Sequence, residues 1–288
     1  MTLRQLLGSR GLVESPRWVA GQIWLSDWTA GEILAVGPDG SHEVVVRHTS
    51  LPLCFDVLPD GRPVLVSNQA KALIAVAADG SLTTYADLAP LSPFGCNDIV
   101  VDGHGNCYVN SGNFDFATGP PDTAVAPGFV AVVRPDGSAT IVADDISFPN
   151  GMAVTADNNT LVVADSYRHC LVGFDIAGDG TLSNRRVWAD LGDGTPDGIC
   201  LDAEDACWYA DVPNENVVRV RQGGERARTI DLGVGGFACM LGGVDGRTLY
   251  VATAEWHGMA SMTGQVPFHG RLLATEVEVP GAGWPART

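Results

Sequence analysis

Basic residues are scarce in this sequence, which has 17 Lys and Arg residues against 34 Asp and Glu residues and a net charge of −17. Binding to nucleic acid or to an anionic membrane needs a basic face, so we expect neither partner. The sequence also lacks any run of about 18 apolar residues, the length that would span a bilayer. The N-terminal stretch MTLRQLLGSRGLVESP has no apolar core of signal-peptide length. These absences predict a cytoplasmic protein.

Motifs that define several common enzyme classes are also missing. The sequence has no GxSxG motif, no Walker loop and no HExxH motif, and its six histidines show no paired spacing for zinc. The seven cysteines are odd in number and include no CxxC pair. We expect them to be buried, reduced thiols, as is usual in the cytoplasm.

What the sequence does contain is one pattern repeated six times. Each segment begins with a short motif, passes a turn rich in Asp, Gly or Asn, and then enters an apolar strand. The motifs are ESPRW at Glu14, CFDVLPDG at Cys54, CNDIVVDGHG at Cys96, FPNGMAVTADNN at Phe148, TPDGICLDAED at Thr195 and FACMLGGVDGR at Phe237. The strands that follow them start near Ile23, Val64, Cys107, Leu161, Cys207 and Leu249.

Successive strands of this pattern are about 40 to 55 residues apart, a period typical of propeller blades of four strands each. We therefore predict an all-β protein, in which residues 1–288 form a single domain with the fold of a six-bladed β-propeller with four-stranded blades. A propeller must also pair its open edge, so we expect strands within residues 6–13 and 272–279 to close the ring.

One segment is longer than its counterparts. Between Asn110 and Phe129 the sequence contains two adjacent prolines and several small residues, which predict a long loop. Such a loop beside a propeller channel serves either as a lid or substrate wall, or is a plain surface excursion.

Four of the six segments place a carboxylate or an amide at the same point, namely Glu14, Asn97, Asn150 and Asp197. The first strand of each blade lines the channel of a propeller, so these side chains should meet at one level of the axis. The alternative is that residues such as Asn150 and Asp197, each followed by glycine, only form turns.

A buried carboxylate is costly if it is unpaired. The equivalent points of the other two segments carry Phe55 and Cys239 rather than a basic residue. A divalent cation is therefore the simplest counter-charge for the two carboxylates. Oxygen ligands favour Ca²⁺, our first expectation, or Mg²⁺ or Mn²⁺, and a small ligand set also allows Zn²⁺.

These residues and their surroundings resemble the SMP-30/gluconolactonase family, also called the regucalcin family. The resemblance runs through nearly the whole chain. It is carried by ESPRW at Glu14, the pair Asn97-Asp98, FPNGMAVTADNNTLVVADS from Phe148, FDIAGDGTLSNRRVWADL from Phe174 and TPDGICLDAEDACWYAD from Thr195.

The resemblance implies a six-bladed propeller with one divalent metal ion at the top of the channel. It implies that Glu14, Asn150 and Asp197 bind the metal ion and that Asn97 holds substrate or water beside it. Members of the family hydrolyse lactones of sugar acids or other small lactones, and some act on phosphotriesters.

The sequence departs from the family at one informative position. Many sugar-lactone members carry an arginine two residues before the asparagine of the Asn-Asp pair, where this sequence has Gly95. The departure argues against a simple aldonolactone as substrate. Four aromatic rings would make a less polar pocket suited to an alkyl or aromatic lactone or ester, or would instead pack the loop; they belong to Phe55, Phe94, Phe114 and Phe116.

We predict from this a metal-dependent hydrolase that opens a small lactone or related ester, with Asp197 as general base and Asn97 as a second catalytic residue. Asp98 would help to orient the substrate, and His257, which follows a strand in AEWHG, is a further candidate for substrate contact. Two alternatives stay open. One is a non-catalytic propeller that binds a small ligand and a metal ion, and the other is an enzyme resembling strictosidine synthase, which the acidic ring disfavours.

Overall fold

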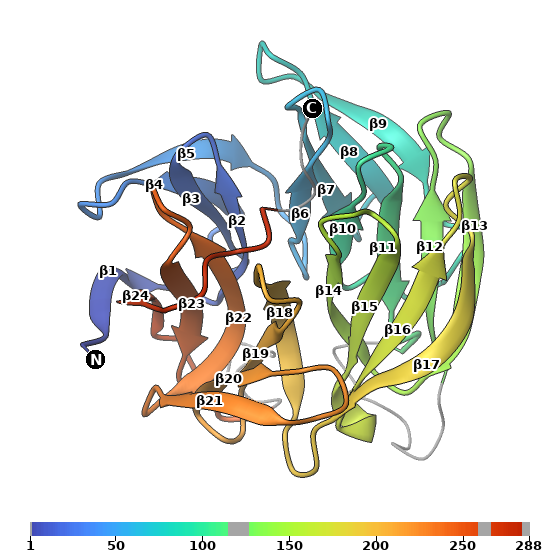
Figure 1. Ribbon diagram of the computed structural model, residues 1–288. Helices are drawn as coiled ribbons and strands as arrows, with labels where there is room; N and C mark the ends of the chain where they lie inside the picture. Colours follow the sequence, from blue (N-terminus) through green and yellow to red (C-terminus); the bar gives the residue numbers. More distant parts are fainter. Residues whose placement is uncertain (1, 115–126, 259–265, 284–288) are drawn as a thin grey trace.

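The computed structural model describes residues 2–114, 127–258 and 266–283. Its strands form six four-stranded sheets arranged around a central channel (Figure 1). The prediction of an all-β, six-bladed propeller with four-stranded blades is thus confirmed.

The first three blades follow one another along the chain. Blade 1 contains β2 (Val13–Val19), β3 (Gln22–Asp27), β4 (Glu32–Val36) and β5 (His42–Arg47). Blade 2 contains β6 (Phe55–Val57), β7 (Pro63–Ser67), β8 (Ala72–Val76) and β9 (Leu82–Asp87). Blade 3 contains β10 (Ile99–Val101), β11 (Cys107–Ser111), β12 (Gly128–Val133) and β13 (Ala139–Ile146).

The last three blades complete the ring. Blade 4 contains β14 (Pro149–Val154), β15 (Thr160–Asp165), β16 (Cys170–Ile176) and β17 (Leu182–Asp190), with the short 3₁₀ helix η1 (Ser166–Arg168) after β15. Blade 5 contains β18 (Pro196–Leu201), β19 (Cys207–Asp211), β20 (Asn216–Val220) and β21 (Arg226–Asp231). Blade 6 contains β22 (Gly235–Gly242), β23 (Thr248–Ala254), β24 (Gly270–Glu276) and, from the other end of the chain, β1 (Arg4–Arg10).

The first strand of each blade lies next to the channel. Neighbouring first strands contact one another in a closed ring, in the order β2, β6, β10, β14, β18, β22 and back to β2. The outermost strands are instead largely exposed, as in β9 and β21. Side chains that leave the inner strands toward the axis therefore converge from different blades.

The hydrophobic core lies between the blades. Six clusters of buried apolar side chains each join two neighbouring blades. In β15, Val162 and Ala164 pack toward blade 5, whereas Leu161 and Val163 pack toward blade 3. Successive side chains of a strand point to opposite faces, and neighbours cover both faces of each blade. This is why the second strands appear in the sequence as continuous apolar runs.

Both ends of the chain close the ring, as predicted. Strand β1 pairs antiparallel with β24, with Arg4 opposite Ala274 and Arg10 opposite Gly270, and the two strands lie side by side in Figure 1. Both strands begin two residues earlier than expected, at Arg4 and at Gly270. On the N-terminal side, Val13 already belongs to the inner strand of blade 1. The N-terminal strand is thus the outer edge of blade 6.

Candidate active site

The four predicted ring residues meet at one end of the channel. Glu14 lies in β2, Asn150 in β14 and Asp197 in β18, while Asn97 comes two residues before β10. Together with Asp98 they line one cavity of about 440 Å³. The structure therefore brings all five side chains to one site, and their roles in metal binding and catalysis stay predictions.

Three inner strands are irregular at the ring residue. The pairing register shifts between Glu14 and Arg17 in β2, between Pro149 and Met152 in β14, and between Pro196 and Ile199 in β18. Such bulges redirect side chains and are frequent beside active sites. The ESP, PNG and PDG motifs of the sequence mark these irregular positions.

The glycines of the PNG and PDG motifs are needed for close packing. A Cβ atom on Gly151 would lie 2.6 Å from the carbonyl oxygen of Asp197, and one on Gly198 would lie 2.4 Å from the Cβ of Ala238. Glycine in a strand often marks such a close approach between backbones. Asn150 and Asp197 thus belong to closely packed inner strands, and the alternative that they only form turns is wrong.

Hydrogen bonds between blades fix the two amides. The Nδ2 of Asn97 donates to the Oδ1 of Asn150 at 3.4 Å and to the carbonyl oxygen of Pro149 at 3.3 Å. The Nδ2 of Asn150 donates to the Oγ of Ser166 at 3.3 Å, and that hydroxyl donates to the carbonyl oxygen of Pro196 at 2.6 Å. The amide groups are therefore held by contacts that run from blade 3 to blade 5.

Three carboxyl groups share this end of the channel: that of Glu14 is buried, and those of Asp98 and Asp197 are half-buried. Burial raises the pKa of Glu14 from its ordinary 4.5 to about 8, against the hydrogen bond that its Oε2 accepts from the Ser15 amide. Burial also raises the pKa of Asp98, opposed by the charge of Arg17. The pKa of Asp197 is raised well above its usual range by burial and, secondarily, by the charges of Glu14 and Asp98. Such a cluster favours a cation, which would stabilise all three carboxylates.

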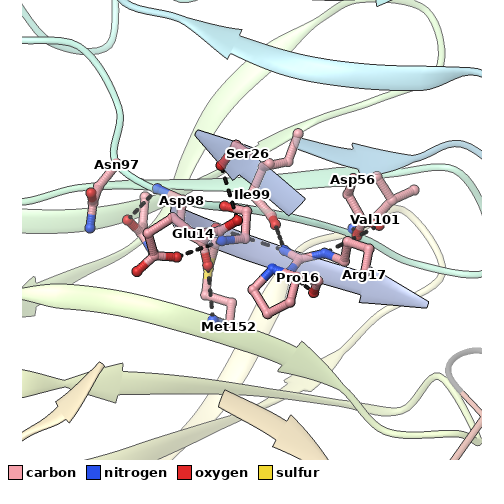
Figure 2. A network of polar contacts seen from close by, with 12 residues as sticks. Glu14, Pro16, Arg17, Ser26, Asp56, Asn97, Asp98, Ile99, Val101 and Met152 are labelled. Carbon is pink, nitrogen blue, oxygen red and sulfur yellow. Dashed lines mark hydrogen bonds and ion pairs between the residues drawn. The ribbon is translucent and has the colours of Figure 1, made fainter. Parts of the chain in front are cut away.

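Figure 2 shows Arg17 beside this cluster, between Asp56 and Asp98. Its Nε lies 3.5 Å from the Oδ1 of Asp56, and its Nη2 lies 3.7 Å from the Oδ1 of Asp98. The same Nη2 donates to the carbonyl oxygen of Ile99 at 2.7 Å. Arg17 was missed in the sequence because regular alternation places residues 14 and 17 on opposite faces of a strand. The bulge in β2 brings both residues to the cluster.

Aromatic rings form much of the wall above the polar floor. They belong to Trp28, Phe114, Phe148, Tyr167, Phe237 and Trp256. Phe148 stacks on Tyr167 with 4.8 Å between ring centroids and lies 5.5 Å from Phe114. Phe237 meets Trp256 edge to face at 5.8 Å. Most of this wall was missed, although a positional signal exists: Trp28, Phe114, Tyr167 and Trp256 all follow the second strand of their blades.

The residues predicted to contact substrate have different positions in the structure. Phe114 lines the cavity. Phe55 is fully buried in the core between blades 1 and 2, beside Trp24, so the structure assigns it to packing. Phe94 is exposed on the surface. Phe116 and much of the predicted 110–129 loop lie outside the described residues.

His257 comes directly after Trp256 but is not one of the cavity residues. Its Nε2 lies 3.9 Å from the Oε2 of Glu255. A contact between His257 and substrate therefore stays a prediction.

The residues at the floor fit a hard divalent ion by their chemistry. Two carboxylates and two amides supply only oxygen ligands, as Ca²⁺ prefers. Two of these four ligands are amides, so only Glu14 and Asp197 belong to the residue types His, Cys, Asp and Glu that most often bind metal ions. Indeed, among residues 2–114, 127–258 and 266–283 no three side chains of those types lie close enough together to hold a metal ion. The metal site thus stays a prediction, supported by the buried carboxyl cluster.

The fold and this site define a class of protein: a six-bladed propeller with a ring of carboxylates and amides at one end of its channel. The model of the SMP-30/Gluconolactonase/LRE-like family matches residues 12–255, so the chain belongs to that family.

In the described part of the chain, no helix is long and apolar enough to cross a membrane.

Three curated relatives match over roughly half to two thirds of the chain. A 6-deoxy-6-sulfogluconolactonase of Pseudomonas putida is 28% identical over 51% of this chain and 52% of its own length. Regucalcin of Danio rerio is 28% identical over 60% of this chain and 59% of its own. Diisopropyl-fluorophosphatase of Loligo vulgaris is 25% identical over 65% of both. The matches therefore span less than two thirds of each relative.

Solved structures agree with the fold over almost the full chain. A luciferin-regenerating enzyme superposes with a TM-score of 0.81 at 18% identity, covering 97% of both chains. A calcium-binding regucalcin of Agrobacterium tumefaciens gives a TM-score of 0.78 at 22% identity, covering 97% of this chain and 95% of the other. At this identity the likeness shows the propeller fold alone.

Proposed function

We propose that this chain is a metal-dependent hydrolase that opens a small lactone or a related ester. The observation that carries the proposal is the floor of the cavity, where one buried and two half-buried carboxyl groups lie beside two oriented amides. Family membership supports a hydrolase, because two relatives carry the names of a lactonase and a fluorophosphatase.

Glu14, Asn150 and Asp197 would hold the metal ion in this proposal. Calcium is our first choice, since the donors are oxygens and relatives carry the name regucalcin. When bound, the ion would polarise the ester carbonyl and stabilise the negative charge that develops on its oxygen.

The side chains of the cavity supply the rest of the chemistry. Asp197 would accept a proton from the attacking water and return it to the leaving alkoxide as the acyl C–O bond breaks. The amide of Asn97, anchored to Pro149, would position the substrate carbonyl. Asp98, whose carboxylate accepts a hydrogen bond from the Met152 amide at 3.3 Å, is held beside it and would help to orient the substrate.

The test is turnover of a panel of lactones and esters by purified protein, with EDTA and after re-addition of Ca²⁺, Mg²⁺, Mn²⁺ or Zn²⁺. The proposal expects ring opening that stops with EDTA and returns with at least one ion. Metal removal by EDTA must be verified in the same samples. Full turnover by the metal-free protein would contradict metal dependence. Metal-dependent thermal stability without turnover of any panel member would instead favour a non-catalytic binding protein.

A further inference from the structure

The cavity above the candidate metal site is apolar on its sides and polar at its floor. Its six aromatic residues come from blades 1, 3, 4 and 6, so rings surround the space on several sides. Leu12 and Val212 add aliphatic surface to the same wall. A pocket of about 440 Å³ with apolar sides and a polar floor resembles sites for small apolar ligands, in which a few polar groups fix the orientation of the ligand.

Among the residues that the structure describes, the side chains of the cavity offer no cationic partner for an anionic group. No Lys, Arg or His belongs to the described residues that line it. Segments 115–126 and 259–265, which the structure does not describe, contain none of these residue types in the sequence. Arg17 is already engaged by Asp56, Asp98 and the carbonyl oxygen of Ile99. Along the aromatic wall, a sulfonate, phosphate or carboxylate of the substrate would therefore be desolvated without a cationic side chain, and the charge of the divalent ion proposed at the floor is already offset by the carboxylates there.

Two polar groups of the wall already have partners, whereas the buried Nε1 of Trp28 has none among the described residues. The Ser166 hydroxyl donates to Pro196 and accepts from Asn150. The hydroxyl of Thr195 lies 3.3 Å from the Nδ1 of His169. Several hydroxyl groups of a sugar lactone would thus face aromatic rings, and burying a hydroxyl without a hydrogen bond is unfavourable.

We infer that the substrate is an uncharged lactone or ester with an apolar alkyl or aromatic substituent, which the rings of Phe148, Tyr167, Phe237 and Trp256 enclose. This inference rests on the proposed function and specifies its substrate. The ester group lies at the floor beside Asn97 and Asp197, and the substituent extends along the aromatic wall.

The test is a series of δ-lactones that share one ring and differ only in an alkyl substituent: δ-valerolactone, δ-octalactone and δ-decalactone, compared with glucono-δ-lactone. We expect kcat/KM to rise by up to about fourfold for each methylene buried against the wall. Glucono-δ-lactone should be slower than δ-decalactone. A flat series, or glucono-δ-lactone as the fastest substrate, overturns the inference but leaves the lactonase proposal standing.

A binding measurement distinguishes an error in the inferred substrate class from an error in the proposed function. Calorimetric titration with δ-decalactam and gluconolactam, in which an amide replaces the ester, needs no turnover. Tighter binding of the apolar lactam without hydrolysis of any lactone would keep the apolar ligand class and reject the hydrolase. Tighter binding of gluconolactam would reject the apolar class whether or not the protein is an enzyme.

A matched pair of variants locates the effect. Trp256→Ala removes a partly exposed ring from the cavity wall, whereas Phe94→Ala removes an exposed ring outside it. Trp256→Ala should lower kcat/KM for δ-decalactone by about tenfold more than it lowers kcat/KM for δ-valerolactone. Phe94→Ala should change neither rate, and equal effects of the two variants on δ-decalactone would contradict a role for this wall.

Discussion

Arg17 of blade 1 and Asp98, which precedes the inner strand of blade 3, form an ion pair across the channel, with 3.7 Å between Nη2 and Oδ1. Asp56 of blade 2 completes the arrangement at 3.5 Å from Nε. Arg17 and Asp56 also line a smaller cavity of about 140 Å³, whereas Asp98 lines the larger one. The ion pair thus lies between the two cavities and offsets part of the negative charge beneath the candidate metal site.

The first prediction is that Arg17→Met strongly destabilises the protein. The substitution leaves the buried carboxylate of Asp56 and the half-buried carboxylate of Asp98 without their cation, so the free energy of unfolding should fall by about 3 kcal/mol. Denaturant unfolding measures this change. The control is Arg221→Met, whose partner Glu225 is exposed, and the loss there should stay below about 1 kcal/mol. Equal, small losses in both variants would show that the central ion pair contributes little.

The fold was predictable because its determinants are local and repeated. Turn motifs and apolar runs recur in every segment, so blade number and the second strands followed from the sequence. The ring of Glu14, Asn150 and Asp197 followed from their equivalent positions. Arg17 did not, since only the paired structure reveals the bulge in β2.

The aromatic wall could not be predicted from the sequence for a different reason. Its rings come from different blades and meet only when the propeller closes, so no sequence period links Phe148 to Phe237. Phe55 illustrates the opposite error. It stands at a repeat position equivalent to the ring residues, but its side chain packs between blades 1 and 2.

The second prediction concerns metal content. Purified protein should contain about one divalent ion per chain, and Glu14→Gln and Asp197→Asn should each lose most of it, because oxygen ligands lose a formal charge. Elemental analysis after gel filtration measures occupancy. Asp60→Asn, which neutralises an exposed surface carboxylate, is the control and should keep full occupancy. Full occupancy in both ring variants would place the ion elsewhere.

The third prediction concerns pH and follows from the raised pKa of Glu14. In metal-free protein, folded Glu14 holds its proton up to about pH 8, whereas the unfolded chain releases it near 4.5. The folded state therefore binds more protons in this window, so the stabilisation that Glu14 contributes is fully present below about pH 4.5 and is lost as pH rises from there through 8. Asp98 and Asp197 shift in the same direction.

Thermal unfolding in EDTA between pH 5 and 8 tests this linkage. The Tm of the wild type should fall with pH more steeply than that of Glu14→Gln. Excess Ca²⁺ should raise the Tm more at pH 8 than at pH 5, because ligands must be deprotonated to bind metal. Parallel curves for wild type and Glu14→Gln in EDTA would contradict the shift at Glu14.

The fourth prediction concerns the seam. Removing residues 2–10 deletes β1 and leaves β24 without its partner at the edge of blade 6. Leu7, which packs in the cluster between blades 6 and 1, is lost as well. We expect a clear drop in Tm and a tendency to associate through the exposed edge, measured by calorimetry and light scattering. An unchanged Tm would mean that the pairing of β1 with β24 contributes little to the stability of the ring.

The last prediction separates metal binding from catalysis at two residues. Asp197→Asn should abolish hydrolysis even when excess metal restores occupancy, because an amide is too weak a base to accept the proton of water. Asn97→Ala should keep the metal ion and lose about 100-fold in kcat, since only a positioning amide is removed. Both rates must be measured at saturating metal, with occupancy determined in the same samples. Near-normal turnover by metal-loaded Asp197→Asn would mean that the base lies elsewhere. Asp98 would then be the next residue to test, because its half-buried carboxyl group lines the same cavity.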